Sequence, residues 1–148
     1  MMGVDYSTPQ SYREAKMLYI KAKINGRDVA MLIDTGAERS IISSSAMRSL
    51  GLSRRLNTST QGTARGVGEA AILGTTENVE IIIKGLDVLM DFYVLDANQM
   101  MIIFGLDMLK RLGCIIDLPQ NRMLVGGPDG IPAKFLSETE IPPEFSMI

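Results

Sequence analysis

The sequence predicts a mainly β fold with one or two short helices. Three observations support this prediction. Short segments rich in β-formers recur along the chain. Asn25-Gly26 is the strongest short hairpin signal in it. The segments that suit a helix are short, and each is ended by a glycine. At 148 residues the chain is most simply one domain with tails and is long enough to bury a real core.

The elements follow in order from local patterns. The predicted strands are Met17–Ile24, Val29–Ile33, Glu77–Ile83, Leu89–Leu95, Met100–Phe104, Cys114–Leu118 and Arg122–Val125, with a short apolar step at 40–43. One helix is predicted over Ala46–Leu50, capped by Ser43 or Ser44, and another over Asp107–Leu112. Residues 52–60 are predicted to form a connecting loop or strand. An imperfect repeat of apolar strand, glycine and capped helix relates 29–51 to 100–113.

The segment Gln61–Gly74 contains four glycines and predicts a hairpin with a glycine-rich tip. It is unlike a phosphate-binding loop, because no Lys-Ser or Lys-Thr follows and no strand–loop–helix context surrounds it. Two interpretations stay open. The hairpin is either a plain surface feature or a lid that closes over a bound substrate.

The tails differ from this central part in composition. Residues 1–16 are polar and aperiodic, and they are interpreted as an N-terminal linker or extension. Residues 17–126 are predicted to form the folded domain. Residues 127–148 are rich in glycine, proline and acidic residues, and they are interpreted as a C-terminal linker.

The composition excludes several kinds of site. The chain has no histidine and a single cysteine, which excludes Ser-His-Asp and Cys-His nucleophilic sites and the usual zinc sites. Cys114 is expected to be a small core residue. The net charge of −2 gives no reason to expect a nucleic-acid or membrane partner. No cofactor and no metal are expected, and a cytoplasmic or nuclear location is expected. Carboxylates, lysine, tyrosine and hydroxyls remain for catalysis.

The stretch Ala30–Ala37 carries an acid, Asp34, at the end of an apolar run. Desolvating an unpaired carboxylate is costly, so an acid in this place needs a reason. One reading is an ordinary turn, since Asp, Thr and Gly are all turn residues. The other reading is catalysis. The local motif alone leaves both open.

Four ordered blocks together resemble the retropepsin-like (retroviral-type) aspartic proteases over roughly residues 17–125. The blocks are Leu32–Ala37, Arg65–Gly68, Ile102–Gly105 and the helix running into Gly113-Cys114. Further segments resemble the protease domain of the DNA-damage-inducible ubiquitin-shuttle family. These are Met17–Ile20, Ala64–Gly68, Gly105–Leu109 and, after the domain, Phe135–Glu138.

The resemblance implies a closed, barrel-like retropepsin fold that forms a homodimer with its active site at the two-fold axis. It implies that Asp34 is catalytic and that Thr35, Gly36 and Ala37 support it, with the Thr35 hydroxyl bonding across the dimer axis. The implied substrate contacts in flap and cleft are Glu38, Arg39, Gly66, Val67, Gly68 and Ile103. Ile42, Ile72 and Ile103 are either pocket walls or plain core.

Two residues depart from the retroviral pattern. Glu38 stands where retroviral enzymes usually have Asp, and Leu106 stands where they have Arg. The ion pair between those two positions therefore cannot form in this chain. The dimer edge and the walls of the subsites are expected to differ accordingly.

The implied activity is peptide hydrolysis by a pair of acids. Two carboxyls about 3 Å apart cannot both ionise and so share one proton, which leaves one as base and one as acid. This chain contains one Asp-Thr-Gly, so activity requires a homodimer. The resemblance points to ubiquitin-tagged proteins as substrates, recognised through modules outside this fragment. The alternatives are a non-catalytic dimeric peptide-binding or shuttle module and a processing protease of a mobile element.

Overall fold

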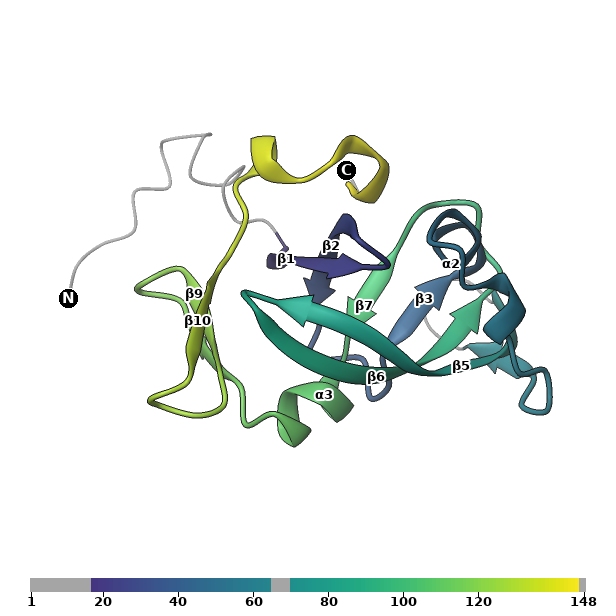
Figure 1. Ribbon diagram of the computed structural model, residues 1–148, viewed down its shortest axis with the longest axis horizontal. Coiled ribbons are helices and arrows are strands. Elements are labelled where there is room, and N and C mark those ends of the chain that lie inside the picture. Colours follow the sequence, from purple (N-terminus) through teal and green to yellow (C-terminus); the bar gives the residue numbers. More distant parts are fainter. Residues whose placement is uncertain (1–16, 65–69, 147–148) are drawn as a thin grey trace.

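A computed structural model describes residues 17–64 and 70–146 and shows a closed six-stranded barrel with a three-stranded sheet beside it (Figure 1). In ring order the barrel strands are β1 (Tyr19–Ile24), β2 (Arg27–Ile33), β7 (Ile102–Phe104), β3 (Ile41–Ser43), β6 (Leu86–Leu95) and β5 (Ala70–Ile83). Pairing of β5 back onto β1 closes the ring. The predicted mainly β, barrel-like fold is confirmed.

The remaining elements extend this barrel. They are β4 (Gly62–Ala64), the small sheet of β8 (Ile115–Asp117), β9 (Arg122–Val125) and β10 (Ile131–Lys134), the helices α2 (Ser44–Ser49) and α3 (Leu106–Arg111), and the 3-10 turns η1 (Ser53–Arg55), η2 (Glu138–Glu140) and η3 (Pro143–Phe145). Strand β4 pairs with β5 outside the closed ring. Two of the barrel pairings, β2 with β7 and β3 with β6, are parallel.

The first hairpin forms where the sequence predicts it. Asn25 and Gly26 both have positive φ, 52° and 74°, as the two-residue hairpin turn requires. The turn sets the register of β1 against β2, with Ile24 opposite Arg27. This register delivers Asp34 directly after the end of β2.

Burial follows the strand pattern. In β1, Ile20, Ala22 and Ile24 point into the core while Lys21 and Lys23 point outward. In β2 the five residues Val29–Ile33 are all buried, which explains why that strand is a continuous apolar run. Asp34 thus follows directly on a strand segment that is buried at every residue.

Both predicted helices form within one or two residues of their expected bounds. Ser43 is the N-cap of α2, and its hydroxyl accepts a hydrogen bond from the Ala46 N–H (3.2 Å). Gly51 and Gly113 follow the two helices with positive φ, 74° and 57°. The two apolar-strand, glycine and helix units come together through the parallel pairing of β2 and β7.

The glycine-rich segment forms a hairpin at its base. Gly62 on β4 lies opposite Ile72 on β5 in an antiparallel pair, and Ala64 lies opposite Ala70. Residues 65–69 between these arms lie outside the described part of the chain. The interpretation of this segment as a lid therefore stays a prediction.

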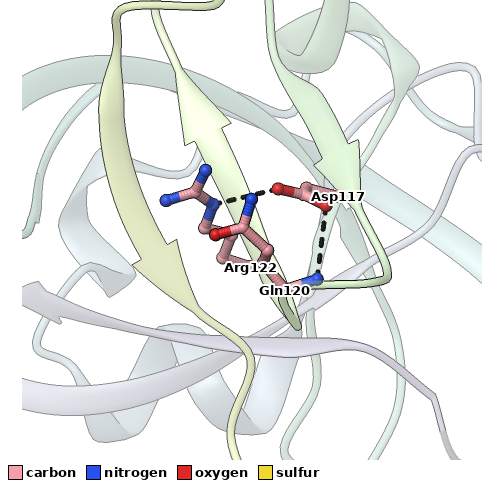
Figure 2. A network of polar contacts seen from close by, with 3 residues as sticks. All are labelled: Asp117, Gln120 and Arg122. Carbon is pink, nitrogen blue, oxygen red and sulfur yellow. Dashed lines mark hydrogen bonds and ion pairs between the residues drawn. The ribbon is translucent and has the colours of Figure 1, made fainter.

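The sheet of β8, β9 and β10 lies to one side of the barrel (Figure 1). Asp117 fixes the β8–β9 turn by accepting from the Arg122 Nε (3.0 Å) and the Gln120 N–H (3.3 Å), as Figure 2 shows. Asn121 takes the positive φ of 53° in this turn. The predicted pair of strands at 114–118 and 122–125 is present.

The interpretation of 127–148 as a linker is corrected over the residues described. β10 pairs with β9, and Ala133, Phe135 and Phe145 are buried in the core. The Leu136 N–H donates to the Tyr19 carbonyl (2.8 Å), which joins the segment to β1. In Figure 1 the segment, in yellow, rises from β10 at the left and then runs along the top of the view above β1 and β2. Glycine and proline spacing hid a four-residue strand that pairs with β9 across the five-residue connection 126–130. The predicted N-terminal linker at 1–16 lies outside the described residues.

Phe145 should make a measurable contribution to the stability of the domain, since its side chain is 3% exposed. We expect Phe145→Ala to lower the free energy of unfolding by about 3 kcal/mol, because truncating a buried aromatic leaves a cavity. Urea denaturation measures the change. The exposed neighbour Glu144 supplies the control, and Glu144→Ala should change stability by less than about 0.5 kcal/mol. Equal effects of the two variants would contradict the buried position of Phe145.

Candidate active site

Asp34 begins a tight loop at the end of β2. Its N–H donates to the Phe104 carbonyl on β7 (3.1 Å), which continues the parallel pairing of the two strands. Its Oδ1 accepts from the Gly36 N–H (2.9 Å), and its carbonyl accepts from the Ala37 N–H (3.3 Å). The residue is half-buried, and the hydrogen bond from the Gly36 N–H orients its carboxylate.

Gly36 leaves room for that carboxylate. A Cβ on Gly36 would lie 3.2 Å from Asp34 Oδ1, closer than ordinary van der Waals contact. Thr35 is exposed in the chain, and Ala37 is half-buried. The bond of the Thr35 hydroxyl across a dimer axis stays a prediction.

The loop rests on the corner between β7 and α3. The Leu106 N–H donates to the Ala37 carbonyl (2.7 Å), and the Asp107 N–H donates to the Glu38 carbonyl (3.2 Å). The side chains of Glu38 and Leu106 cannot form an ion pair. Backbone hydrogen bonds join their two segments instead. A Cβ on Gly105 would lie 2.8 Å from the Ala37 carbonyl oxygen, so the loop packs directly onto glycine backbone.

Sequence reasoning missed a buried polar cluster behind this loop. The Ser40 hydroxyl donates to Asp107 Oδ1 (2.8 Å) and accepts from the Gly105 N–H (3.0 Å), and the Ser40 N–H donates to Asp107 Oδ2 (3.0 Å). Ser40 is 1% exposed. The sequence shows Asp107 as an acid in the first turn of a predicted helix. Nothing near Asp107 in the sequence indicates that its partner, Ser40, lies 67 residues away.

Asp34 has no cationic partner within 17–64 and 70–146. The ion pairs in this part of the chain join Lys21 to Asp28 (3.6 Å) and Arg122 to Asp117 (3.0 Å). No group of three or more His, Cys, Asp or Glu side chains among the described residues could hold a metal ion. A half-buried carboxylate at a strand end that accepts from the N–H two residues later is compatible with both an ordinary turn and a catalytic acid, so the catalytic role of Asp34 stays a prediction.

The other predicted contacts are placed as follows. Glu38 and Arg39 are exposed on the same loop. Arg39 and Ser40 line an open hollow of about 240 Å³ that also touches Tyr93. Gly66, Val67 and Gly68 lie outside the described residues. As substrate contacts, all of these residues stay predictions.

The three isoleucines differ in exposure. Ile42 is fully buried and Ile103 is 8% exposed, so both pack in the barrel core. Ile72 is half-buried on β5. The core alternative therefore holds for Ile42, and the role of Ile103 as a substrate contact stays a prediction.

Cys114 is not expected to act as a nucleophile, because burial raises the pKa of its thiol from 9.0 to about 11. The thiolate reacts and the thiol does not, so at pH 8 we expect iodoacetamide to alkylate Cys114 about 100-fold more slowly than an ordinary cysteine. The rate should rise about tenfold per pH unit up to the raised pKa. Mass spectrometry measures the rate. The urea-unfolded chain is the control, and equal rates in the folded and unfolded chains would contradict the burial.

Comparison with known proteins decides the family. The family model described as "Aspartyl protease" matches residues 9–117, which is most of the chain and includes Asp34. This chain belongs to the aspartyl protease family. The predicted identity as a retropepsin-like domain of the DNA-damage-inducible kind is confirmed by the relatives and by a solved structure.

Two curated relatives and one structure show the similarity. "DNA damage-inducible protein 1" of Cryptococcus neoformans var. neoformans serotype D (strain JEC21) is 40% identical over 140 residues, which cover 95% of this chain and 31% of that protein. "Protein DNA-DAMAGE INDUCIBLE 1" of Arabidopsis thaliana is 38% identical over 137 residues, 93% of this chain and 33% of that protein. The crystal structure of the retroviral protease-like domain of Ddi1 from Leishmania major matches with a TM-score of 0.75 and 33% identity, and covers 86% of this chain and 99% of that one.

The aspartyl protease domain thus spans about a third of the length of the curated relatives that it matches. Across the described residues, no helix has both the length and the apolar character that a membrane crossing needs.

Proposed function

We propose that this aspartyl protease domain is a homodimeric endopeptidase in which two copies of Asp34 form the reaction centre. The observation that carries the proposal is the half-buried Asp34 carboxylate, oriented by the Gly36 N–H (2.9 Å) and lacking a cationic partner among the described residues. The chain has one Asp-Thr-Gly, and a second carboxyl must therefore come from a second copy.

The chemistry follows from the pair. One carboxyl, ionised, takes a proton from the attacking water, and the other, protonated, donates a hydrogen bond to the carbonyl oxygen of the scissile peptide. Two carboxyls about 3 Å apart hold one proton between them, which provides both forms at once. Peptide hydrolysis should therefore weaken when the shared proton is lost in alkali and when a second proton is gained in acid.

A surface for the second copy is available on the small sheet. β8 is the edge strand of that sheet, and Ile115 (37% exposed) and Leu118 (62% exposed) present apolar side chains there. An edge strand offers unpaired backbone groups to another chain. We place the dimer contact at β8 and β9 for this reason.

Extended peptide segments are the proposed substrates, covered by the β4–β5 hairpin and bound by strand-like backbone hydrogen bonds. Glu38 and Arg39 are the proposed contacts on the described loop. Ubiquitin-tagged proteins in the cytoplasm or nucleus are the proposed natural substrates, on the strength of the family resemblance and through modules outside this chain.

One experiment separates this proposal from a non-catalytic module. Wild type and Asp34→Asn are compared by light scattering and by cleavage of a random peptide library. We expect both to be dimers and only the wild type to cleave. Peptide binding without turnover in both proteins would favour the non-catalytic module. Equal cleavage by both would show that Asp34 is not the catalytic acid.

A further inference from the structure

One short corner of the chain holds the whole Asp34 loop. The Phe104 carbonyl accepts from the Asp34 N–H (3.1 Å) at the start of the loop. The Leu106 N–H donates to the Ala37 carbonyl (2.7 Å) in the middle. The stretch Phe104–Asp107 therefore supports the Asp34 loop through backbone hydrogen bonds, and we call this stretch the template.

Asp107 is the member of this template that binds the end of the loop through its side chain. Its carboxylate accepts from the Ser40 hydroxyl (2.8 Å) and the Met108 N–H (2.8 Å) on Oδ1 and from the Ser40 N–H (3.0 Å) on Oδ2. The Gly105 N–H in turn donates to the Ser40 hydroxyl (3.0 Å). Every polar atom of the Ser40 side chain and of the Asp107 carboxylate is thus used.

The geometry requires a carboxylate at this position. Both carboxylate oxygens of Asp107 accept from donors. In an asparagine at this position, the amide nitrogen would replace one of these oxygens and would face an N–H or O–H donor. In the part of the chain that the structure describes, no cation pairs with Asp107. The carboxylate therefore orders neighbouring donors and does not take part in an ion pair.

Close backbone packing at Gly105 also connects the Asp34 loop to the template. A Cβ on Gly105 would lie 2.8 Å from the Ala37 carbonyl oxygen and 2.9 Å from the Arg39 carbonyl carbon and oxygen. The loop backbone thus touches the template backbone with no side chain between them. Through these contacts, a shift of the Ser40 end of the loop would reach Ala37 and the Asp34 end of the loop.

We propose that Asp107 is a positioning residue for Asp34: by holding Ser40, it sets the position of the loop that carries the catalytic carboxylate. The inference rests on the proposed function of Asp34. Asp107 itself does not touch the reacting atoms. Losing it should displace the loop and slow the chemical step while the barrel stays folded.

The test is Asp107→Asn, measured in two ways on the full chain. Hydrogen exchange should become at least about tenfold faster at the amides of Asp34, Gly105 and Leu106, with amides between β5 and β6 unchanged. Cleavage of a peptide selected from the library should lose at least about tenfold in kcat, with KM within about twofold of wild type, because a misplaced catalytic group weakens the transition state more than substrate binding.

Asp28→Asn is the matched control. It makes the same substitution on β2, the strand that leads to Asp34, but Asp28 is exposed and forms an ion pair with Lys21 (3.6 Å). It should leave loop exchange, kcat and KM unchanged. If Asp107→Asn fails to fold, Ser40→Ala replaces it, because it keeps the backbone bond to Asp107 and removes only the hydroxyl. Ser40→Ala should give the same pattern at smaller size.

The outcomes are distinguishable. Exchange at the loop amides no faster than in the control would overturn the proposal, and so would a uniform acceleration across the barrel, which would indicate a purely structural role. An unchanged kcat beside a loosened loop would also overturn it. The wild type could cleave nothing while Asp107→Asn still speeds exchange at the loop amides as expected. That result would show that Asp107 fixes the loop and that the proposed hydrolysis is wrong.

Discussion

Mixing the wild-type chain with a tenfold excess of the Asp34→Asn variant should lower the hydrolysis rate per wild-type chain about elevenfold, because random pairing leaves one wild-type chain in eleven with a wild-type partner. A dimer with one Asp34 replaced has lost the second carboxyl and cannot share a proton. The pure variant should lose at least about 10³-fold in kcat, as expected for removal of acid–base catalysis. Peptide cleavage after co-refolding of the mixture measures the effect.

The variant should keep its fold. Asn retains an oxygen that can accept from the Gly36 N–H, the contact that orients Asp34 (2.9 Å). The control is the same mixture assayed before the subunits exchange, in which the excess variant competes for substrate but does not form mixed dimers. Inhibition that is already complete in this control would indicate substrate competition. A rate independent of the added variant would show that a single chain is sufficient.

Gly74→Ala should be the most destabilising single substitution among the glycines described. A Cβ there would lie 2.0 Å from the Asn57 carbonyl oxygen and 2.9 Å from its carbon, and Gly74 has a φ of 152° that side chains rarely adopt. Asn57 is bonded to Thr75 in both directions, at 2.7 and 2.9 Å, so it cannot move away without breaking that bridge. We expect a loss of about 4 kcal/mol in the free energy of unfolding, from overlap and backbone strain together.

Two controls separate those causes in urea denaturation. Gly62 on β4 has no atom near its missing Cβ, so Gly62→Ala should change stability by less than about 0.5 kcal/mol. Gly85 has open space but a φ of 81°, so Gly85→Ala should cost about 1 kcal/mol from strain alone. A Gly74→Ala effect no larger than that of Gly85→Ala would refute the close approach of β5 to Asn57.

Most of the local structure could be predicted from the sequence. The Asn25-Gly26 turn, the Ser43 cap and the glycines after both helices depend on residues near one another in sequence, and each is found as predicted. The Asp-Thr-Gly at the end of an apolar run was also visible locally. The final segment was not, because the strand Ile131–Lys134 is stabilised by pairing with β9 and its own pattern is weak.

By itself, the sequence determined that the fold is mainly β, that one acid ends an apolar run, and that histidine chemistry is absent. These properties depend on residue type and short-range spacing. Only the tertiary structure decided that Ser40 meets Asp107 across 67 residues, that Gly105 bears directly on the Asp34 loop, and that Phe145 closes the core. Such contacts depend on how distant segments pack, and hydrogen bonding and steric fit between them leave no periodic trace in the chain.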